Sequence, residues 1–540
     1  MLARCSTAAL QGLEAQEVVV EVDIAPGLPG LQMVGLADAA VQESRERVRS
    51  ALRHSGLKVP LTRVVVNLAP ADLRKEGPSF DLPIALGLLV ASGQLAAGQL
   101  QGVWSCGELG LDGGLRPLRG VLAVALHAHH CGARALIVPA ANAAEALLVK
   151  GLAVWPAANL AGALALLQGD EAPVLPSPAT PPTPMASALD LGDVRGQQHG
   201  RRALEIAAAG GHHLLLCGAP GSGKTMLAQR LPGLLPPLSL AEALEITQIH
   251  SVAGQLAPGS GLVQQRPFRS PHHSCSAPAL VGGGATPQPG ELSLAHHGVL
   301  FLDELAEFRR SVLDQLRQPL EEGAVWIHRA RRRSRFPCRI TLVGATNPCP
   351  CGWYGDPERA CSCGEGARRR YWSRLSGPLL DRLDLQVVMR RPSCGDLGAA
   401  FRGTPQGDSP EPSALVSQRV RRARQSMAQR NPGGWSNGQL SSAQLRSVVS
   451  LTPEALSLWE GALQQRHLSA RAGERVLRVA QTISDLNQPD TNGFGEAPKG
   501  TIRSGAHRPQ AMGCQGMRRQ AIKPSAIAEA LTYRSFDQLL

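Results

Sequence analysis

The chain has 540 residues, of which 43% are hydrophobic and only 3% aromatic, and its formal net charge is +12. That length predicts about two or three domains, and that composition excludes collagen-like and wholly disordered chains. Only six of the 55 basic residues are lysines, so the positive charge reflects an arginine-rich composition and indicates a nucleic-acid partner only where it clusters.

We expect no membrane partner, because no apolar run reaches the roughly 18 residues that a spanning helix requires. Residues 1–16 make a poor secretory signal, since they contain only a short apolar run before Glu14. The 12 cysteines are too sparse for a disulfide-stabilised fold of this size. These features predict a cytoplasmic protein.

The first segment, residues 1–170, alternates strand-like and helix-like stretches. The runs at residues 18–24 (VVVEVDI) and 63–67 (RVVVN) predict strands, because they are rich in β-branched residues. Helices are predicted at residues 38–54, where apolar residues recur at helical spacing, and at residues 81–91. This alternation predicts an α/β domain.

Proline-rich stretches separate the remaining parts of the chain. Linkers are predicted at residues 171–188 and 401–414, which leaves residues 189–400 as a central domain and residues 415–540 as a helical part. Inside that last part, residues 487–520 are rich in glycine, proline and arginine without an apolar pattern. We predict a disordered insertion there, either tolerated at the surface or damaging to the fold.

A phosphate-binding loop follows the apolar strand predicted at residues 214–217. The pattern G-x-x-x-x-G-K-[ST] in a strand–loop–helix context is typical of proteins that bind ATP and Mg²⁺. Lys224 is predicted to reach the β- and γ-phosphates and Thr225 to bind Mg²⁺, while backbone N–H groups surround the phosphates. The loop consists of Gly218, Ala219, Pro220, Gly221, Ser222, Gly223, Lys224 and Thr225.

Two further strands are predicted to end in polar side chains of the same site. The run at residues 299–302 ends in Asp303 and Glu304, which we expect to hold Mg²⁺ and to act as general base on the attacking water. The strand at residues 340–345 is followed by Asn347, which would sense the γ-phosphate or orient the water. The alternative is an ordinary turn asparagine before Pro348.

Four long motifs carry a resemblance to a known family. The sequence resembles the magnesium-chelatase-like AAA+ family, and within it the YifB/ComM group of competence-related proteins. The resemblance covers residues 3–486 and resumes at residues 522–534. The motifs are DVRGQ (Asp193–Gln197), GVLFLDEL (Gly298–Leu305), ATNPCPCGWYGD (Ala345–Asp356) and RLSGPLLDRLDL (Arg374–Leu385).

The resemblance implies an α/β fold with an AAA+ P-loop ATPase core around a parallel sheet and a C-terminal helical lid. Asp193–Gln197 would border the adenine. Arg382 resembles the arginine finger, which completes the site of a neighbouring subunit by neutralising charge on the γ-phosphate. Arg471 resembles the sensor-2 arginine, although Arg475 and Arg478 on nearby turns remain alternatives.

The resemblance also implies that residues 1–170 form a domain like the proteolytic domain of Lon proteases. Ser79 stands where the nucleophile would be. The catalytic dyad needs a lysine base, but residues 115–125 contain none, and Arg119 cannot deprotonate. We therefore expect a proteolytically inactive domain.

Two segments are candidates for contact with a polymer. A predicted hairpin, with strands at residues 325–328 and 339–343, has a basic tip that would contact DNA phosphates or simply be a solvated loop. The segment at residues 248–294 carries Phe268, Arg269, His272 and His273, whose histidines are equally compatible with a structural role. The hairpin arginines are Arg329, Arg331, Arg332, Arg333 and Arg335.

Four cysteines, Cys349, Cys351, Cys361 and Cys363, form two C-x-C pairs close together in the chain. Four thiolates can close a tetrahedral structural Zn²⁺ site, and the alternative is four reduced thiols.

The predicted function is that of an ATP-hydrolysing ring motor acting on DNA. The resemblance implies a homo-oligomer, expected to be a hexamer, that promotes branch migration as a helicase during recombination in natural transformation. The alternatives are an ATPase subunit that drives Mg²⁺ insertion into a porphyrin, and an ATP-dependent protein-remodelling factor.

Overall fold

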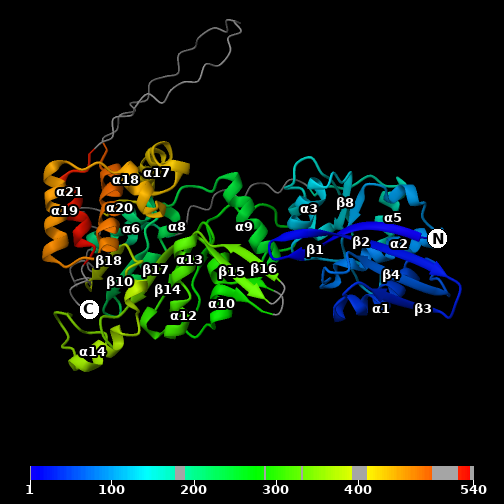
Figure 1. Cartoon of the computed structure of the whole chain (residues 1–540), viewed down its shortest axis with the longest axis horizontal. Helices are drawn as coiled ribbons and strands as arrows, with labels where there is room; N and C mark the ends of the chain where they lie inside the picture. The colour runs from blue at the N-terminus through cyan, green and yellow to red at the C-terminus, as the bar shows by residue number, and fades with distance from the viewer. Residues whose placement is uncertain are drawn as a thin grey trace, which may run out of the picture.

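The computed structural model describes residues 2–176, 189–284, 287–329, 332–391, 410–488 and 521–534 (Figure 1). Its three parts, an amino-terminal sheet, a central sheet and the carboxy-terminal helices, follow one another along the longest axis. The predicted linkers and the predicted insertion at residues 487–520 lie largely outside the described residues. Within those residues, no helix is long and apolar enough to cross a membrane.

The amino-terminal part is built on a seven-stranded mixed sheet in the order β3-β4-β2-β1-β5-β8-β9. The strands predicted at residues 18–24 and 63–67 are present inside β2 and β4. The bounds of the strands are β1 Leu2–Gln11, β2 Glu14–Ala25, β3 Gly30–Val34, β4 Arg63–Ala69, β5 Val103–Ser105, β8 Ala135–Pro139 and β9 Ala153–Ala157.

Helices α1 (Ala39–His54), α2 (Asp81–Ala91), α3 (Val121–His130) and α5 (Leu160–Gln168) accompany this sheet. The side chain of Asp38 caps α1 by accepting the N–H of Val41 at 2.8 Å. The apolar face that the spacing predicted on α1 is fully buried. Because the expected strands and helices are present, the prediction of an α/β amino-terminal domain is confirmed.

The central part is a five-stranded parallel sheet in the order β11-β14-β17-β10-β18. Its three middle strands are buried along their whole length, as expected for parallel strands covered on both faces. All carboxyl ends therefore meet at one edge and all amino ends at the other. The strands are β10 Leu214–Gly218, β11 Phe268–Arg269, β14 Val299–Leu302, β17 Thr341–Thr346 and β18 Leu385–Met389.

The carboxy-terminal helices pack against α6 (Gln198–Gly210) of the central part and share one hydrophobic core with it (Figure 1). These helices are α17 Ser413–Arg430, α18 Ser442–Val448, α19 Pro453–Gln465, α20 Ala470–Leu486 and α21 Pro524–Thr532. The parallel central sheet and the helical carboxy-terminal part confirm the predicted fold class.

The amino-terminal and central parts meet along α9 (Leu240–Val252). The N–H of Gly120 donates to the backbone oxygen of Ser251 at 3.2 Å, and the Ser251 hydroxyl donates to the buried carboxylate of Glu145. On the same helix, Gln248 Nε2 donates to the Leu13 carbonyl at 2.7 Å. Hydrogen bonds made by buried groups therefore tie the two parts together.

The predicted basic hairpin exists, but its second strand was wrongly placed. β15 (Ala324–Arg329) pairs antiparallel with β16 (Arg332–Pro337), whereas residues 341–343 belong to the central strand β17. The error arose because residues 332–337 are mostly arginine and polar, so their strand character is hidden in an apolar pattern search. Arg331, together with the side chains of Arg329 and Arg332, lies outside the described residues.

Candidate nucleotide site and the cavities of the central part

The phosphate loop connects β10 to α7 (Lys224–Ala228) at the carboxyl edge of the central sheet. Gly221 and Gly223 have φ values of 77° and 86°, a left-handed conformation that lets the backbone turn around a small space. Lys224 Nζ fills part of that space by donating to the backbone oxygens of Gly218 at 2.7 Å and Ala219 at 3.1 Å. Burial lowers the pKa of Lys224, so the ammonium gains from an anionic partner.

The structure brings the two predicted Mg²⁺ ligands and the predicted sensor to this loop. Thr225 Oγ1 donates to Asp303 Oδ2 at 2.8 Å, and Lys224 Nζ donates to Asn347 Oδ1 at 3.2 Å. A hydroxyl and a carboxylate in contact beside a lysine are the donor set that a Mg²⁺–triphosphate complex requires. The arrangement follows from the parallel sheet, because Asp303 and Asn347 follow strands that end at the same edge as β10.

Glu304, the predicted general base, is held by a residue whose role the sequence did not reveal. Its backbone is left-handed, with φ of 51°, and its N–H donates to Asp303 Oδ1 at 2.9 Å. His273 Nδ1 lies 2.9 Å from Glu304 Oε2. The sequence indicated either a polymer contact or a structural role for His273, and not a contact with Glu304; the available signal was its position shortly after β11, the strand beside β14.

The other residues singled out near His273 also have partners inside the chain. Phe268 stacks on Phe301 with ring centroids 5.9 Å apart. Arg269 donates through Nε and Nη2 to the two carboxylate oxygens of Glu291, both at 2.7 Å. The contacts of these two side chains fit the structural interpretation of the segment.

The segment predicted to border the adenine lies against the phosphate loop. Gln197 has a left-handed backbone with φ of 49°, and its Nε2 donates to the Ser222 carbonyl at 3.1 Å. Nearby, Arg230 Nη2 contacts Asp193 Oδ2 at 3.2 Å. The segment thus lies beside the phosphate loop, and its contact with an adenine stays a prediction.

Arg382 and Arg471 are not near the phosphate loop of the same chain. Arg382 precedes β18 and therefore lies at the amino edge of the sheet, whereas Lys224 follows the carboxyl end of the adjacent strand β10. A five-residue strand separates these edges by roughly 17 Å. Arg382 and Arg471 instead line one cavity of about 610 Å³ at the amino edge.

Inside that cavity, an ion pair within the chain holds Arg382. Its Nη2 lies 2.5 Å from Glu321 Oε1, and its Nη1 donates to the Pro378 carbonyl at 2.6 Å. Arg475, an alternative sensor arginine, donates to the buried Asp384 at 2.5 Å and to the backbone oxygen of Arg382 at 3.0 Å. Arg475 is thus bound to the segment that carries Arg382, and Arg471 and Arg478 also line the cavity.

The four cysteines of the central part come together in space. Cys349 Sγ lies 3.3 Å from Cys351 Sγ and 3.6 Å from Cys361 Sγ, and all four sulfurs lie within 4.8 Å of one another. Four sulfurs bound to one Zn²⁺ at about 2.3 Å would be roughly 3.8 Å apart, so the cluster has the size of a tetrahedral site. The backbone N–H of Trp353 lowers the pKa of the Cys351 thiol, whereas burial raises that of Cys349, so among the packed sulfurs the thiolate is favoured first at Cys351.

The cysteine cluster directly adjoins the phosphate loop. Gly352, which follows Cys351, packs closely on the phosphate loop. A methyl group placed on it would lie 2.8 Å from Pro220 Cδ. On the other side, Trp372 Nε1 donates to the Pro348 carbonyl at 3.1 Å. The segment that carries the first two cysteines is therefore packed between the phosphate loop and Trp372 of α14 (Glu365–Trp372).

In the basic hairpin, arginines pack on an aromatic ring. The guanidinium of Arg333 lies 4.0 Å from the centroid of Trp326, and that of Arg335 lies 5.9 Å from it. A methyl group on Gly12, in the turn between β1 and β2, would lie 3.3 Å from Ser334 Cβ. The hairpin thus packs against the amino-terminal part and presents cationic side chains.

The serine and the arginine of the Lon-like segment have different surroundings. Ser79 lies in a short 3₁₀ turn, and its carbonyl accepts the N–H of Gly107 at 3.0 Å. Arg119 packs on the central part, where a methyl group on Gly254 would lie 2.5 Å from its Nε. Arg119, the cation nearest to the region where the lysine base would be, is therefore part of a contact with the central part.

Comparisons with known proteins agree with this architecture. Three family models match: "Magnesium chelatase, subunit ChlI" at residues 190–397, "Subunit ChlI of Mg-chelatase" at residues 20–142 and "Magnesium chelatase, subunit ChlI C-terminal" at residues 410–494.

Among individual proteins, YifB of Escherichia coli strain K12 is 46% identical over 484 residues, which are 90% of this chain and 93% of YifB. The competence protein ComM of Haemophilus influenzae is 44% identical over 482 residues, 88% of this chain and 92% of ComM. Lon protease 2 of Bacillus subtilis is 31% identical over 187 residues, which are 29% of this chain and 32% of the protease.

Proposed function

The chain belongs to the YifB/ComM group of magnesium-chelatase-like AAA+ ATPases, and from this premise we propose that it is a ring-shaped motor that moves DNA. In this proposal a homo-hexamer hydrolyses ATP at sites between subunits and drives branch migration during recombination of incoming DNA. The name of the relative ComM, a competence protein, supports the link to natural transformation. Its place of action would be the cytoplasm.

The observation that carries the proposal is the separation of Lys224 and Arg382 onto opposite edges of one sheet. One chain thus holds two incomplete halves of a hydrolytic site, one with the phosphate loop and one with the cavity that contains Arg382 and Arg471. Stacking subunits head to tail would bring the two halves together, and head-to-tail contacts close into rings. Arg382 would then neutralise charge on a neighbour's γ-phosphate.

Hydrolysis would use the side chains gathered at the carboxyl edge. Lys224 would hold the β- and γ-phosphates, and Thr225 and Asp303 would hold Mg²⁺, whose charge stabilises the transferring phosphoryl group. Glu304 would accept a proton from the attacking water after leaving His273, and Asn347 would orient that water. Without a neighbour, Arg382 stays on Glu321, so an isolated subunit would turn over slowly.

DNA is proposed as the cargo because of the basic hairpin. Arg333 and Arg335 beside Trp326 offer phosphate contacts and an aromatic ring without a pattern for reading bases, as a motor that passes along any sequence requires. For the cysteine cluster we propose a structural Zn²⁺ held by Cys349, Cys351, Cys361 and Cys363, since four ligands leave no open position for catalysis.

The test is the ATPase rate of the full-length protein with single-stranded DNA, forked DNA, a porphyrin or an unfolded protein added. We expect stimulation by DNA that weakens steeply with salt. If only the porphyrin stimulated the ATPase, the proposed DNA translocation would be wrong, and metal insertion, the reaction that the family name suggests, would take its place. Electron microscopy with a non-hydrolysable ATP analogue and forked DNA shows whether the ring forms, and a protein that stays monomeric would contradict the proposal.

A further inference from the structure

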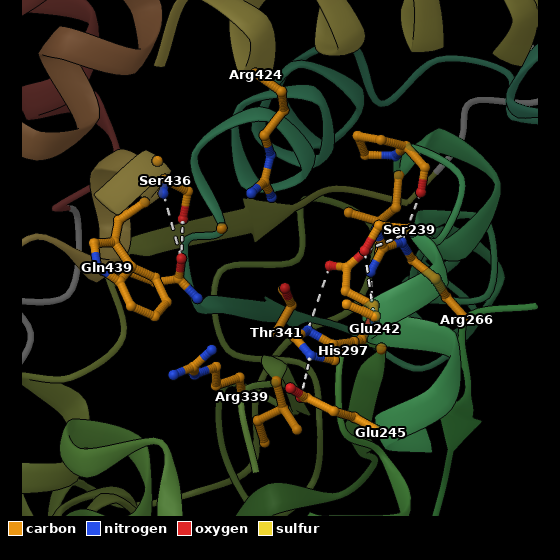
Figure 2. Close-up of a pocket in the computed structure, with 18 of the residues that line it drawn as sticks. Ser239, Glu242, Glu245, Arg266, His297, Arg339, Thr341, Arg424, Ser436 and Gln439 are labelled. Carbon is orange, nitrogen blue, oxygen red and sulfur yellow. Dashed lines mark hydrogen bonds and ion pairs between the residues drawn. The ribbon is translucent and has the colours of Figure 1, made fainter. Parts of the chain in front are cut away.

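A second cavity, of about 420 Å³, lies at the amino edge of the central sheet (Figure 2). It adjoins the cavity that contains Arg382, because both are lined by Arg339 and Gln439. Residues of α9 and of the starts of β14 and β17 form one wall, and Arg424 of α17 with the segment 433–439 forms the other. We call it the lid–core cavity. The phosphate loop takes no part in its lining, and neither do Arg382 and Arg471, although Arg339, Trp435 and Gln439 line both cavities.

One carboxylate of this cavity is already satisfied. Glu245 Oε2 lies 2.9 Å from His296 Nε2 and 3.0 Å from His297 Nε2. His296 Nδ1 accepts the backbone N–H of Arg339 at 2.9 Å, so the neutral ring carries its proton on Nε2 and donates it to Glu245. That proton occupies the position a metal ion would need, so this Glu–His–His group does not form a metal site.

The second carboxylate is neutralised as well. Glu242 Oε2 lies 3.3 Å from Arg266 Nη2, and Arg266 also donates to the backbone oxygens of Pro236 and His297, both at 2.7 Å. Arg266 therefore has carbonyl and carboxylate partners around its guanidinium. It closes the wall of the cavity and is not the group that would attract a ligand.

Two other arginines lack such partners. Arg424 donates through Nε and Nη2 to a neutral acceptor, the Ala208 carbonyl, at 3.1 and 2.8 Å. Arg339 lies over Trp435, 4.4 Å from its centroid. Among the residues that the structure describes, neither guanidinium forms an ion pair with a carboxylate, and in Figure 2 Arg424 points from the lid side towards the cavity.

The energetics of Arg424 favour an anion. Burial lowers the pKa of Arg424 to about 10; the charge of Arg266 lowers it further and that of Glu242 opposes the shift only weakly. Gln439 adds a neutral donor, since its Oε1 accepts from Ser436 Oγ at 2.9 Å and its Nε2 remains to donate. Apolar side chains of Leu235, Pro236 and Ile340 line the remainder.

We propose that the lid–core cavity binds a small phosphate-bearing molecule, with its phosphate on Arg424 and Arg339 and its organic part against the apolar wall. Guanidinium groups match phosphate oxygens in a planar, two-pronged geometry. The volume lies within the about 300–1,000 Å³ of small-molecule sites, which disfavours a long polymer. Because Arg424 belongs to the lid and Arg339 to the core, the ligand would fasten the two together.

The experiment uses full-length Lys224→Ala protein, in which the phosphate loop is impaired, with inorganic pyrophosphate and ADP as probes. We expect both probes to raise the unfolding temperature and to give a binding isotherm by calorimetry. Tighter binding of ADP would show that the organic part contributes. Binding of pyrophosphate alone would assign the site to the phosphate group only and would overturn the role of the apolar wall.

Arg424→Met added to Lys224→Ala is expected to weaken binding at least tenfold, and Arg339→Met is the second variant in case the first does not fold. Arg421→Met, on the exposed side of the same helix, and Arg471→Met, in the neighbouring cavity, are the matched controls. Unchanged binding in Arg424→Met and Arg339→Met, or loss of binding in Arg471→Met alone, would overturn the proposal. None of these outcomes depends on ATP hydrolysis.

Discussion

His273 Nδ1 lies 2.9 Å from Glu304 Oε2, so the imidazole holds the carboxylate that is proposed to take a proton from water. A carboxylate oxygen that is held by a neighbouring ring is aimed at that ring and not at a water. The contact therefore describes a resting state of the site. The rings of His273 and Phe308 also meet in a T-shaped contact, with centroids 6.4 Å apart.

We expect His273→Ala to raise ATP turnover without DNA by a few-fold, because Glu304 is released, and to reduce the further stimulation by DNA. His272→Ala, which removes the neighbouring ring, is the control and should keep normal regulation. Glu304→Gln should lower turnover by about 100-fold or more, as for the loss of a general base. A His273→Ala protein with basal and stimulated rates like the wild type would contradict this relationship.

Mixing two inactive variants tests whether sites form between subunits. Lys224→Ala and Arg382→Ala are each expected to lower turnover by about a thousandfold or more. In a mixed ring, about a quarter of the interfaces would join an intact phosphate loop to an intact arginine, so activity should return. Mixing Lys224→Ala with Glu304→Gln, both in the same half, should restore nothing. If the mixture of Lys224→Ala and Arg382→Ala regained no ATP turnover, Arg382 would act within its own chain.

The hairpin arginines should determine the affinity for DNA. Arg333→Ala with Arg335→Ala is expected to weaken binding of single-stranded DNA, and to reduce the slope of log affinity against log salt by about 1 to 2, since each lost phosphate contact contributes about 0.7. Arg4→Ala, at an exposed ion pair with Glu21, should change neither quantity. An unaltered slope measured by fluorescence anisotropy would place the DNA contact elsewhere.

The cysteine cluster should contain about one zinc ion per chain by elemental analysis of the purified protein. Cys361→Ser with Cys363→Ser is expected to remove the metal and to lower the unfolding temperature by roughly 5 °C. Since Gly352 packs on Pro220, we also expect weaker ATP binding. Cys131→Ser, at an exposed cysteine, is the matched control. Metal-free protein with normal stability would leave four reduced thiols as the correct interpretation.

Stability should fall as the pH is lowered from about 6.5 to about 4. His213 is hydrogen-bonded as an acceptor to the Leu342 N–H at 3.1 Å, and burial lowers its pKa to about 4. An unfolded histidine has a pKa of about 6.5, so between these values the unfolded chain binds the extra proton and is favoured. Urea unfolding at pH 8, 6 and 5 measures the slope.

His296, whose pKa is also lowered to about 4, contributes to the same pH window. His213→Asn should therefore flatten the dependence in part and not entirely. A slope that stays the same in His213→Asn would show that this ring keeps its ordinary pKa in the folded protein.

The side chains that lie together as the sequence predicted are those whose position depends on neighbouring residues or on the strand they follow. The loop from Gly218 to Thr225 has a conformation set by its own glycines. Asp303 and Asn347 could be assigned to it because each follows an apolar strand, and parallel strands end at a common edge. His273 could not be paired with Glu304 in the same way, because it lies beyond the two-residue strand β11, where the side-chain direction depends on packing against Phe308.

The second hairpin strand was misplaced for a related reason. Residues 332–337 form β16 although their composition is polar and basic, because pairing with β15 and the contact of Arg333 with Trp326 stabilise them. Strand formation there comes from a partner strand and not from apolar alternation.

By itself, the sequence determined which groups gather at the carboxyl edge of the central sheet: a glycine-rich loop with Lys224, the acids that follow β14, and four thiols close together in the chain. Those properties depend on residues that are neighbours in the chain or that follow strands. The tertiary structure alone decided that Arg382 and Arg471 share a cavity at the opposite edge, and that Arg424 faces Arg339 across the lid and the core. The strand order and the packing of the lid on α6 set those positions, and both depend on contacts between segments far apart in the sequence.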